Sequence, residues 1–369
     1  MKICHMTSAH DSNDIRIFQK ECVYLAKNPK NQVFLVAPGE SREERNVNVI
    51  GVGKYGNGRL GRMFRLSRDV YKAALALDAD IYHFHDPELL PYGLKLKKRG
   101  KCVIFDSHEN TAEQIKIKKY IPKGFRKLVS SIYFKYETKV CLKLDAVIFP
   151  AIDVEESMFK GRSQKIVLVD NLPILEEMVI DRSKKIPGAY CCVGTLTEDR
   201  GITKMLEASK LIRGTLILAG RFYPEDYKEE LEKKGLLDLV KYKGIVNRDE
   251  VVEIYNQSNV GLSTLLHVGQ YDNCSNFPTK EYEYMAMGIP VVRTDFKRTK
   301  KLFEKYDFGI SVNPDNPEDI ANAVNLLLEN DNLRREKGEN GLKAAKSRFN
   351  WESEATKITE LYNSLLKEM

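Results

Sequence analysis

The chain has 369 residues, 43% of them hydrophobic, which is more than one hydrophobic core usually supports and predicts two globular domains. No uninterrupted run of about 18 apolar residues occurs, so a membrane-spanning helix is excluded. The seven cysteines form no CxxC pair and no disulfide spacing, and the N-terminus lacks the apolar stretch of a signal peptide. These features predict a soluble cytoplasmic protein.

The net charge of +7 is unevenly distributed along the chain. Residues 1–170 contain 30 lysines and arginines against 20 acidic residues, a net of +10. Residues 171–369 contain 29 against 32, a net of −3. A basic first half favours an anionic partner for that half.

In the first half, short apolar runs alternate with amphipathic stretches, which is typical of α/β units with a parallel sheet. Helices are predicted to begin near Asp14 and at Pro87, which follows the N-cap residue Asp86. The predicted strands cover residues 2–6, 32–37, 47–52, 81–85, 102–106, 146–150 and 165–169.

The second half repeats this pattern after a polar link at residues 170–188. Its predicted strands cover residues 189–194, 215–219, 240–243, 259–264, 290–293 and 309–312. Its clearest helices cover residues 278–287, 317–330, 332–348 and 351–367. We therefore predict two doubly wound, Rossmann-like α/β domains that face each other across a cleft, where ligands would bind beyond the carboxyl ends of the strands.

The loop from Gly194 to Gly201 joins a predicted strand to a helix. A helix N-terminus offers free N–H groups and a partial positive charge, and Arg200 adds a bidentate donor for phosphate. The loop therefore favours a nucleotide diphosphate. An ordinary connection with a solvated arginine is the alternative interpretation.

A second candidate phosphate loop, residues 274–288, contains Lys280 in the first turn of a helix. A cation there is unfavourable to the helix dipole unless an anion binds. Glu283 lies on the same face, where its carboxylate would accept two ribose hydroxyls. The alternative is an exposed Lys/Glu pair. A third segment, residues 240–246, ends in a glycine turn whose backbone would border the base.

Three further motifs resemble metal or cofactor sites, but their positions in the chain favour other roles. Asp78-Ala79-Asp80 matches the DxD metal motif but precedes its strand, at the wrong end of the sheet. The GxGxxG match at residues 56–61 follows the third strand and favours a flexible loop over a dinucleotide site. His83 and His85 share one face of a strand and are interpreted as packing residues. We therefore predict no metal ligand and no cofactor.

Residues 116–143 contain nine lysines and arginines against one acidic residue, Glu137, with apolar residues interleaved. Such a basic amphipathic stretch favours contact with an anionic membrane surface. A solvated helix whose apolar side packs on its own domain is the alternative. No nucleic-acid-reading motif accompanies the basic residues.

Several segments together resemble the retaining family-four GT-B glycosyltransferases of bacterial polysaccharide and lipid-linked glycan assembly. The main one is the donor-site signature, which reads PTKEYEYMAMGIPVV at residues 278–292. The others are Gly194 to Gly201, DIRIFQKE at 14–21, HFHD at 83–86, FDSHE at 105–109 and FNWE at 349–352. The resemblance covers nearly the whole chain.

The resemblance implies an acceptor-side domain at residues 1–175, a donor-binding domain at 176–351 and a C-terminal helix at 352–369 that crosses back to the first domain. It assigns His108, Arg200 and Lys280 to catalysis, and Glu283 to the donor ribose. The donor-binding set is Gly194, Thr195, Arg200, Ile245, Ser275, Asn276, Phe277, Pro278, Thr279, Lys280 and Glu283. The acceptor-side set is His10, Asp14, Arg16, His85, Asp86 and Glu109.

The implied reaction moves a sugar, with retention and without a metal, from a UDP- or GDP-linked donor to a glycan or lipid-linked acceptor. Arg200 and Lys280 would stabilise the charge that grows on the departing diphosphate. Two positions depart from the family pattern: Ser275 replaces an acidic residue and Thr195 an arginine. An inactive or purely binding nucleotide-sugar protein, or an epimerase on the same fold, therefore remain alternatives.

Overall fold

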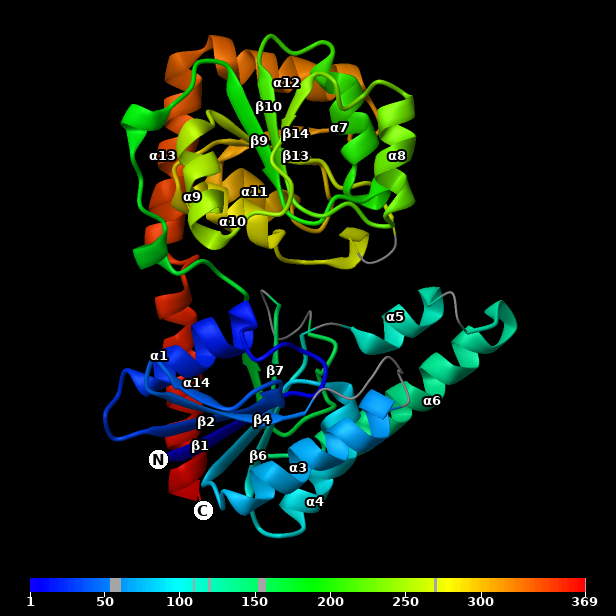
Figure 1. The fold of residues 1–369 in the computed structure, drawn as a ribbon, viewed down its shortest axis with the longest axis vertical. Coiled ribbons are helices and arrows are strands. Elements are labelled where there is room, and N and C mark those ends of the chain that lie inside the picture. The colour runs from blue at the N-terminus through cyan, green and yellow to red at the C-terminus, as the bar shows by residue number, and fades with distance from the viewer. Residues whose placement is uncertain (54–60, 109, 119–120, 152–156, 269–270, 369) are drawn as a thin grey trace. The chain divides into compact units, whose positions relative to one another are not determined.

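The computed structural model divides the chain into two compact units, which are described separately (Figure 1). Unit 1 comprises residues 1–171 and 353–369, and unit 2 comprises residues 172–352. The structure describes all residues except 54–60, 109, 119–120, 152–156, 269–270 and 369. The GxGxxG match at 56–61 thus lies almost wholly outside the described residues.

Unit 1 is built on an eight-stranded sheet with the order β3-β4-β2-β1-β5-β6-β7-β8, parallel except for β3. The strands are β1 Lys2–Met6, β2 Gln32–Pro38, β3 Arg42–Glu44, β4 Val47–Val52, β5 Ile81–Phe84, β6 Cys102–Asp106, β7 Ala146–Phe149 and β8 Ile166–Leu168. The helices and helical turns are η1 Ile15–Cys22, α1 Val23–Ala26, η2 Arg62–Leu66, α3 Ser67–Ala76, η3 Pro87–Leu89, α4 Leu90–Lys97, α5 Thr111–Ile117, α6 Lys123–Cys141 and α14 Trp351–Glu368.

Unit 2 contains a six-stranded, fully parallel sheet with the order β11-β10-β9-β12-β13-β14. Its strands are β9 Ala189–Val193, β10 Thr215–Ala219, β11 Val240–Tyr242, β12 Val260–Ser263, β13 Val291–Thr294 and β14 Gly309–Val312. Its helices and helical turns are η5 Leu175–Glu177, η6 Arg182–Lys184, η7 Glu198–Arg200, α7 Ile202–Ser209, α8 Asp226–Lys233, α9 Arg248–Gln257, η8 Tyr271–Asn273, α10 Thr279–Ala286, α11 Lys300–Tyr306, α12 Pro317–Glu329 and α13 Asp331–Ser347.

Unit 2 has helices on both faces of its sheet because its strands carry apolar side chains on both faces. On β9, Tyr190 and Cys192 pack into the core with α7, α8 and α12, whereas Cys191 and Val193 pack into the core with α9, α10 and α13. Continuous apolar runs suit strands that are covered by helices on both sides, as Figure 1 shows for this unit. The predicted α/β fold with two doubly wound sheets is confirmed.

Local sequence signals set several helix ends. The Asn247 side chain accepts from the Glu250 backbone N–H, and the Glu250 side chain accepts from the Asn247 backbone N–H, which makes a capping box at the start of α9. Pro278 precedes α10, and Gly288, with φ of +64°, follows it in the left-handed conformation that favours glycine.

Helix α14 belongs to unit 1 from Ser353 onward, where its Tyr362 is buried against the sheet. In the part of the chain that the structure describes, no helix is long and apolar enough to span a bilayer. The strand β3 was not predicted, because three residues are too few for a hydrophobic pattern.

Candidate functional site

In both units the chain order reverses between two neighbouring strands, and the loops after those strands are where ligands bind in open α/β sheets. In unit 2 this point lies between β9 and β12. The loop after β9 begins at Gly194, whose φ of +131° favours glycine. A carbon added to Gly194 would lie 3.7 Å from Nη1 of Arg200 and 3.9 Å from Nζ of Lys280. The structure thus brings the two predicted phosphate-binding cations to the same glycine.

A second glycine permits the close packing of this loop. A carbon added to Gly201, which has φ of +73°, would lie 1.8 Å from the carbonyl oxygen of Thr264, at the end of β12. The loop is tied to this strand end again where the Leu266 N–H donates to the carbonyl of Asp199 over 3.0 Å. Gly201 is also the N-cap residue of α7, which begins at Ile202, so the helix N-terminus opens beside Arg200. Its free N–H groups favour an anion there.

Lys280 lies in the first turn of α10 and is partly buried. Its Nζ is 3.3 Å from Sγ of Cys192 in β9. The ammonium is therefore held at the end of the β-sheet rather than extended into solvent as in the alternative interpretation. Lys280 and Arg200 together thus present two cationic groups to which a phosphate group can accept hydrogen bonds.

Glu283, one turn further along α10, is held by two residues of α9. Nη1 of Arg248 lies 2.6 Å from one carboxylate oxygen, and the hydroxyl of Tyr255 donates to the other over 2.6 Å. Burial disfavours the Arg248 charge, but the Glu283 carboxylate more than compensates, so the pKa of Arg248 is raised. Burial and this carboxylate both raise the pKa of Tyr255. The Glu283 side chain is 14% exposed, so a ligand hydroxyl would still reach it.

The other predicted donor-binding residues divide by exposure. Thr195, Thr279 and Ile245 are exposed, with 75% of Ile245 accessible, and Asn276 and Pro278 are partly exposed. Ser275 is buried, and the ring of Phe277 packs among Tyr282, Phe308 and Phe349 in the core. Phe277 would therefore reach a ligand only through its backbone.

In unit 1, the reversal lies between β1 and β5 and brings histidines together. His5 of β1 is paired in register with His83 of β5, so both project from the same sheet face. His85 and Asp106 continue this face at the ends of β5 and β6, while Met6 and Phe84 pack into the opposite core. Five of the six histidines of the chain lie in or beside this cluster.

The rings form a continuous hydrogen-bonded chain. Nε2 of His108 lies 3.1 Å from Nδ1 of His85, whose Nε2 lies 3.0 Å from Nδ1 of His5. The Tyr362 hydroxyl lies 3.3 Å from Nε2 of His5 and 2.7 Å from Nδ1 of His83. Burial lowers the pKa of His85 to about 4 and those of His5 and His83 well below the ordinary value, so these imidazoles are neutral at pH 7.

A buried guanidinium and two carboxylates complete the cluster. Nη2 of Arg16 lies 3.0 Å from both Asp106 carboxylate oxygens, and its Nε lies 3.2 Å from Oε1 of Glu21. Burial opposes both charges, yet the ion pair raises the pKa of Arg16 and holds that of Asp106 well below its usual range. Burial and the neighbouring Asp106 raise the pKa of Glu21. Arg16 therefore acts as a buried support.

Asp86 fixes the loop that follows β1. One of its oxygens accepts from the Thr7 hydroxyl and from the backbone N–H groups of Ser8 and Ala9, at 2.5–3.1 Å. The other lies 2.9 Å from Nδ1 of His10. Burial alone would raise the pKa of Asp86, but these donors lower it to about 2. Asp86 thus holds His10 in place.

The predicted acceptor-side residues differ in what they can reach. Asp14 caps η1 by accepting from the N–H groups of Arg16 and Ile17. Arg16, His85 and Asp86 are buried, whereas the side chains of His108 and His10 are 17% and 33% exposed. Glu109 lies outside the described residues. Direct contact with an acceptor is therefore open to His10 and His108, with the buried residues holding them.

Sequence reasoning missed Arg248, Tyr255, Glu21, His5 and Tyr362. Each acts on a partner between 16 and 357 positions away, as with Glu21 and His5 or Tyr362 and His5. No spacing along the chain marks such pairs. For His5, Glu21 and Tyr362 the one available signal was a charged or polar residue beside apolar ones, whereas Arg248 stands among other polar residues and had no such signal.

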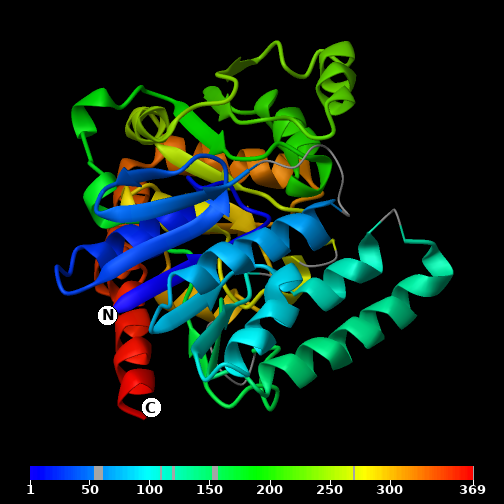
Figure 2. The same ribbon diagram turned by 60° about the horizontal axis from the view of Figure 1, so that its bottom comes forward.

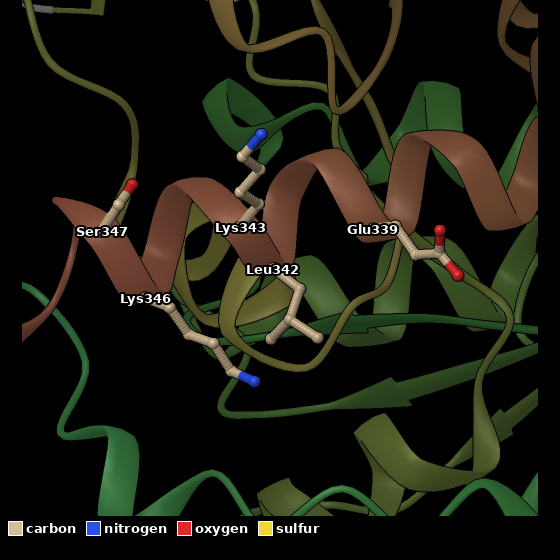
Figure 3. A pocket seen from close by; sticks show the side chains of 5 residues that line it. All are labelled: Glu339, Leu342, Lys343, Lys346 and Ser347. Carbon is tan, nitrogen blue, oxygen red and sulfur yellow. The ribbon is translucent and has the colours of Figure 1, made fainter.

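Two hollows in unit 2 are lined by other residues. One, of about 780 Å³, is lined by residues that include His267, Arg293 and Asp295. The other lies along α13, where Figure 3 shows Lys343 on one side of the helix and Leu342 and Lys346 on the other. These lysines do not converge, so the second hollow has no anion-binding geometry.

The sequences of both units match known protein families. Residues 176–344 match the model of the glycosyl transferases group 1, and residues 22–172 match that of Glycosyltransferase Family 4. The capsular polysaccharide biosynthesis glycosyltransferase CapM of Staphylococcus aureus is 23% identical over 181 residues, 48% of this chain and 46% of CapM. The match thus spans about half of that relative.

Solved structures show the same fold over the full length. Sucrose-phosphate synthase of Thermosynechococcus elongatus has a TM-score of 0.79 at 17% identity, with 100% of both chains covered. Anabaena HepE in complex with UDP-glucose has a TM-score of 0.73 at 16% identity, covering 99% of this chain and 100% of HepE. With its two family matches covering most of the sequence and its two doubly wound sheets, the chain belongs to the group 1 glycosyltransferases of the GT-B fold.

Proposed function

We propose that this protein transfers a sugar from a nucleoside-diphosphate sugar, UDP- or GDP-linked, and that unit 2 binds the donor. The observation that carries the proposal is the convergence of Arg200 and Lys280 on Gly194, beside the N-terminus of α7. Glu283, held by Arg248 and Tyr255, supplies a fixed carboxylate for the ribose hydroxyls. The complex of HepE with UDP-glucose supports a donor of this class.

The proposed chemistry follows from where charge develops. As the bond between the sugar carbon and the phosphate oxygen breaks, its electron pair moves to the diphosphate. Fixed positive groups stabilise this charge more in the transition state than in the ground state. Arg200 and Lys280 would supply that stabilisation in place of a metal ion. The acceptor hydroxyl bonds to the sugar carbon, with retention of configuration, and its proton passes to the departing phosphate.

For unit 1 we propose a role in acceptor binding. His10 and His108 are partly exposed in the loops after β1 and β6, with rings 5.2 Å apart. An imidazole donates to and accepts from hydroxyl groups, which suits a glycan. The CapM relative, named for capsular polysaccharide biosynthesis, supports an acceptor in polysaccharide synthesis. A lipid-linked glycan as acceptor and a hexose as the transferred sugar are part of the same proposal.

Thermal unfolding with nucleotides tests the donor site. A ligand that binds only the folded protein raises its melting temperature. We expect one of UDP, GDP, ADP and CMP to stabilise the wild type, with and without EDTA, and to lose this effect in Glu283→Ala. The variant Glu339→Ala, at an exposed position on α13, should respond as the wild type does. No shift with any nucleotide at millimolar concentration would refute the donor-site assignment.

A binding protein without transferase activity is the second candidate, because Ser275 replaces the acidic residue expected near the donor sugar. Release of nucleotide from the stabilising nucleotide sugar, with and without added glycan acceptors, separates the two. Stabilisation of the wild type with no turnover would favour this candidate over the transferase.

We also propose that α6 contacts an anionic membrane surface. Along this helix, apolar residues at helical spacing are 38–61% exposed: Phe125, Leu128, Val129, Ile132 and Tyr136. The single acid, Glu137, is buried and pairs with Arg162 over 2.6 Å, so among the described residues of 116–143 the exposed charges are all positive. Figures 1 and 2 both show α5 and α6 projecting from the sheet of unit 1. An apolar stripe flanked by lysines suits an anionic interface.

Co-sedimentation with lipid vesicles tests this proposal. The wild type should pellet with phosphatidylglycerol-containing vesicles at low salt and release them at high salt. Ile132→Glu should abolish pelleting, whereas Leu211→Glu, at an exposed apolar position of unit 2, should not. Failure of the wild type to pellet would refute the contact, and salt-independent self-association through the same stripe would point to a second copy of the chain instead.

A further inference from the structure

Glu21 is a buried carboxyl group of unit 1. Its side chain is 0% exposed, and none of the residues that the structure describes donates a hydrogen bond to either of its oxygens. Nε of Arg16 lies 3.2 Å from Oε1, but Arg16 is already committed to Asp106. A buried charged or polar group left in this way costs several kcal/mol, so such groups usually have a partner. The opposite oxygen, Oε2, faces three imidazoles instead.

The three imidazole nitrogens surround this oxygen at nearly equal distances. Oε2 lies 3.7 Å from Nδ1 of His5, 3.8 Å from Nδ1 of His83 and 3.9 Å from Nε2 of His85. These contacts are too long for hydrogen bonds. All four atoms lie within 4.8 Å of one another, and Nδ1 of His5 is 3.0 Å from Nε2 of His85. Four ligand atoms around a tetrahedral zinc ion, with bonds of about 2.0–2.1 Å, lie about 3.3–3.4 Å apart. The observed spacings bracket that value.

The second nitrogen of each ring also has a polar neighbour. Nε2 of His5 faces the Tyr362 hydroxyl at 3.3 Å. Nδ1 of His85 and Nε2 of His83 face the same oxygen of Asp106, at 3.5 and 3.9 Å. Metal-binding histidines commonly donate their other N–H to a carboxylate or another polar group, which orients the ring. Asp106 is itself fixed by Arg16, so this outer layer is rigid.

The chemistry of the four side chains suits a cation as well. Histidine binds metal ions through a neutral ring nitrogen and glutamate through its ionised carboxylate. The Asp106 carboxylate balances the charge of Arg16, so the bound ion would be the cation that pairs with Glu21. Three imidazoles and one carboxylate, with no Cys among them, favour zinc or a similar first-row divalent ion over calcium or magnesium.

We propose that His5, His83, His85 and Glu21 bind one divalent transition-metal ion, of the zinc class, as a closed structural site inside unit 1. All four ligands are buried, and protein side chains supply all four positions of a tetrahedron, as in structural rather than catalytic zinc sites. The ion would join β1, β5 and η1, and would replace the hydrogen bond between Tyr362 and Nδ1 of His83. The proposal does not depend on the proposed glycosyl transfer.

Metal content of the full chain, purified without a histidine tag or chelator, tests the proposal. We expect about one zinc-class ion per chain by mass spectrometry, either as isolated or after loading with Zn²⁺. Loading with Co²⁺ instead should give the intense visible absorption of a tetrahedral site. Removal with a strong chelator should lower the melting temperature, because the ion binds only the folded chain.

Matched substitutions separate this site from adventitious binding. Glu21→Gln and His83→Asn should lose the ion, whereas Glu354→Gln, another buried glutamate of unit 1, and His267→Asn of unit 2 should keep it. Tyr362→Phe, a milder change that should leave the fold intact, should weaken metal affinity by about 10-fold. If the wild type takes up no ion after loading, or if Glu21→Gln and His83→Asn keep it, the proposal is wrong. Glu21 would then be a protonated acid within a metal-free hydrogen-bonded network.

Discussion

In both units, the strand order reverses between two neighbouring parallel strands, but the residues beside this reversal point differ. They are partly exposed in unit 2 and buried in unit 1. In unit 2, the loops after β9 and β12 present glycines, a helix N-terminus and two partly exposed cations, Arg200 and Lys280. In unit 1, the loops after β1 and β5 lie over histidines and charged groups that are 0–6% exposed. One fold therefore supports what we propose to be an open anion receptor in one unit and a closed polar core in the other.

The difference between the two units predicts how substitutions of charged residues at the two reversal points will act. In the open receptor, a substituted cation removes an interaction with the ligand and leaves its neighbours solvated. In the closed core, a substituted charge leaves its partner buried without compensation, which costs far more stability. We therefore expect substitutions of the unit 2 cations to affect ligand binding or turnover, and substitutions in the buried cluster of unit 1 to affect folding.

The largest expected effect is on the stability of unit 1. Arg16→Met removes the guanidinium that holds Asp106 and approaches Glu21, and should lower the free energy of unfolding by about 3–5 kcal/mol. Chemical denaturation should show this loss, while nucleotide binding by the folded variant stays close to the wild type. Arg68→Met, which breaks an exposed ion pair with Asp69, should cost under about 1 kcal/mol. Equal losses in both variants would contradict a closed core.

Next comes the corresponding change in unit 2. Lys280→Met should lower turnover by about 10²–10³-fold with little change in stability, because the ammonium acts on charge that develops in the transition state. Steady-state kinetics and thermal unfolding together check this. Lys343→Met, an exposed lysine on α13, serves as the control and should leave both unchanged. A large loss of stability in Lys280→Met would mean that this lysine supports the fold instead.

The fold could be predicted from the sequence because each strand has a recognisable local pattern of apolar residues. Apolar runs such as residues 33–37 and 216–219 mark strands buried on both faces, and all thirteen predicted strands are found within one or two residues of their expected ends. The helix after Gly201 was predicted and is α7, whereas α8 was not predicted, because its apolar stripe is short and it carries many charges. Tertiary packing rather than local pattern stabilises such helices.

The candidate sites were predictable only in part, for a physical reason. Arg200, Lys280 and Glu283 stand in loops and first turns whose chemistry can be interpreted along the chain. Glu21 and His5 meet only through the register of β1 with β5 and the packing of η1, and Tyr362 reaches them from the last helix. Such contacts depend on three-dimensional arrangement, so His83 was interpreted as a packing residue although it lies in a polar cluster.

A smaller effect, and one that depends on pH, is expected at Asp86. The pKa of its carboxyl is lowered to about 2 from 3.8, so its ionised form contributes roughly 2 kcal/mol of stability above pH 4. This contribution should disappear as the pH falls from about 4 to 2. The unfolding free energies of the wild type and Asp86→Asn should therefore differ most near pH 5 and converge at low pH. A constant difference across this range would assign the effect to packing rather than to charge.

The smallest effect tests whether Glu283 needs the support of α9 in an otherwise open receptor. Tyr255→Phe removes the hydroxyl that donates to Glu283 over 2.6 Å but leaves Arg248 in place. Loss of one such hydrogen bond, worth about 1 kcal/mol, should weaken binding of the stabilising nucleotide by roughly 5-fold, as calorimetry would measure. Tyr227→Phe removes a similar bond, to Thr203, away from Glu283 and should leave affinity unchanged. If both variants bind as the wild type does, Arg248 alone positions the carboxylate, and the open receptor of unit 2 depends on fewer buried supports than the closed core of unit 1.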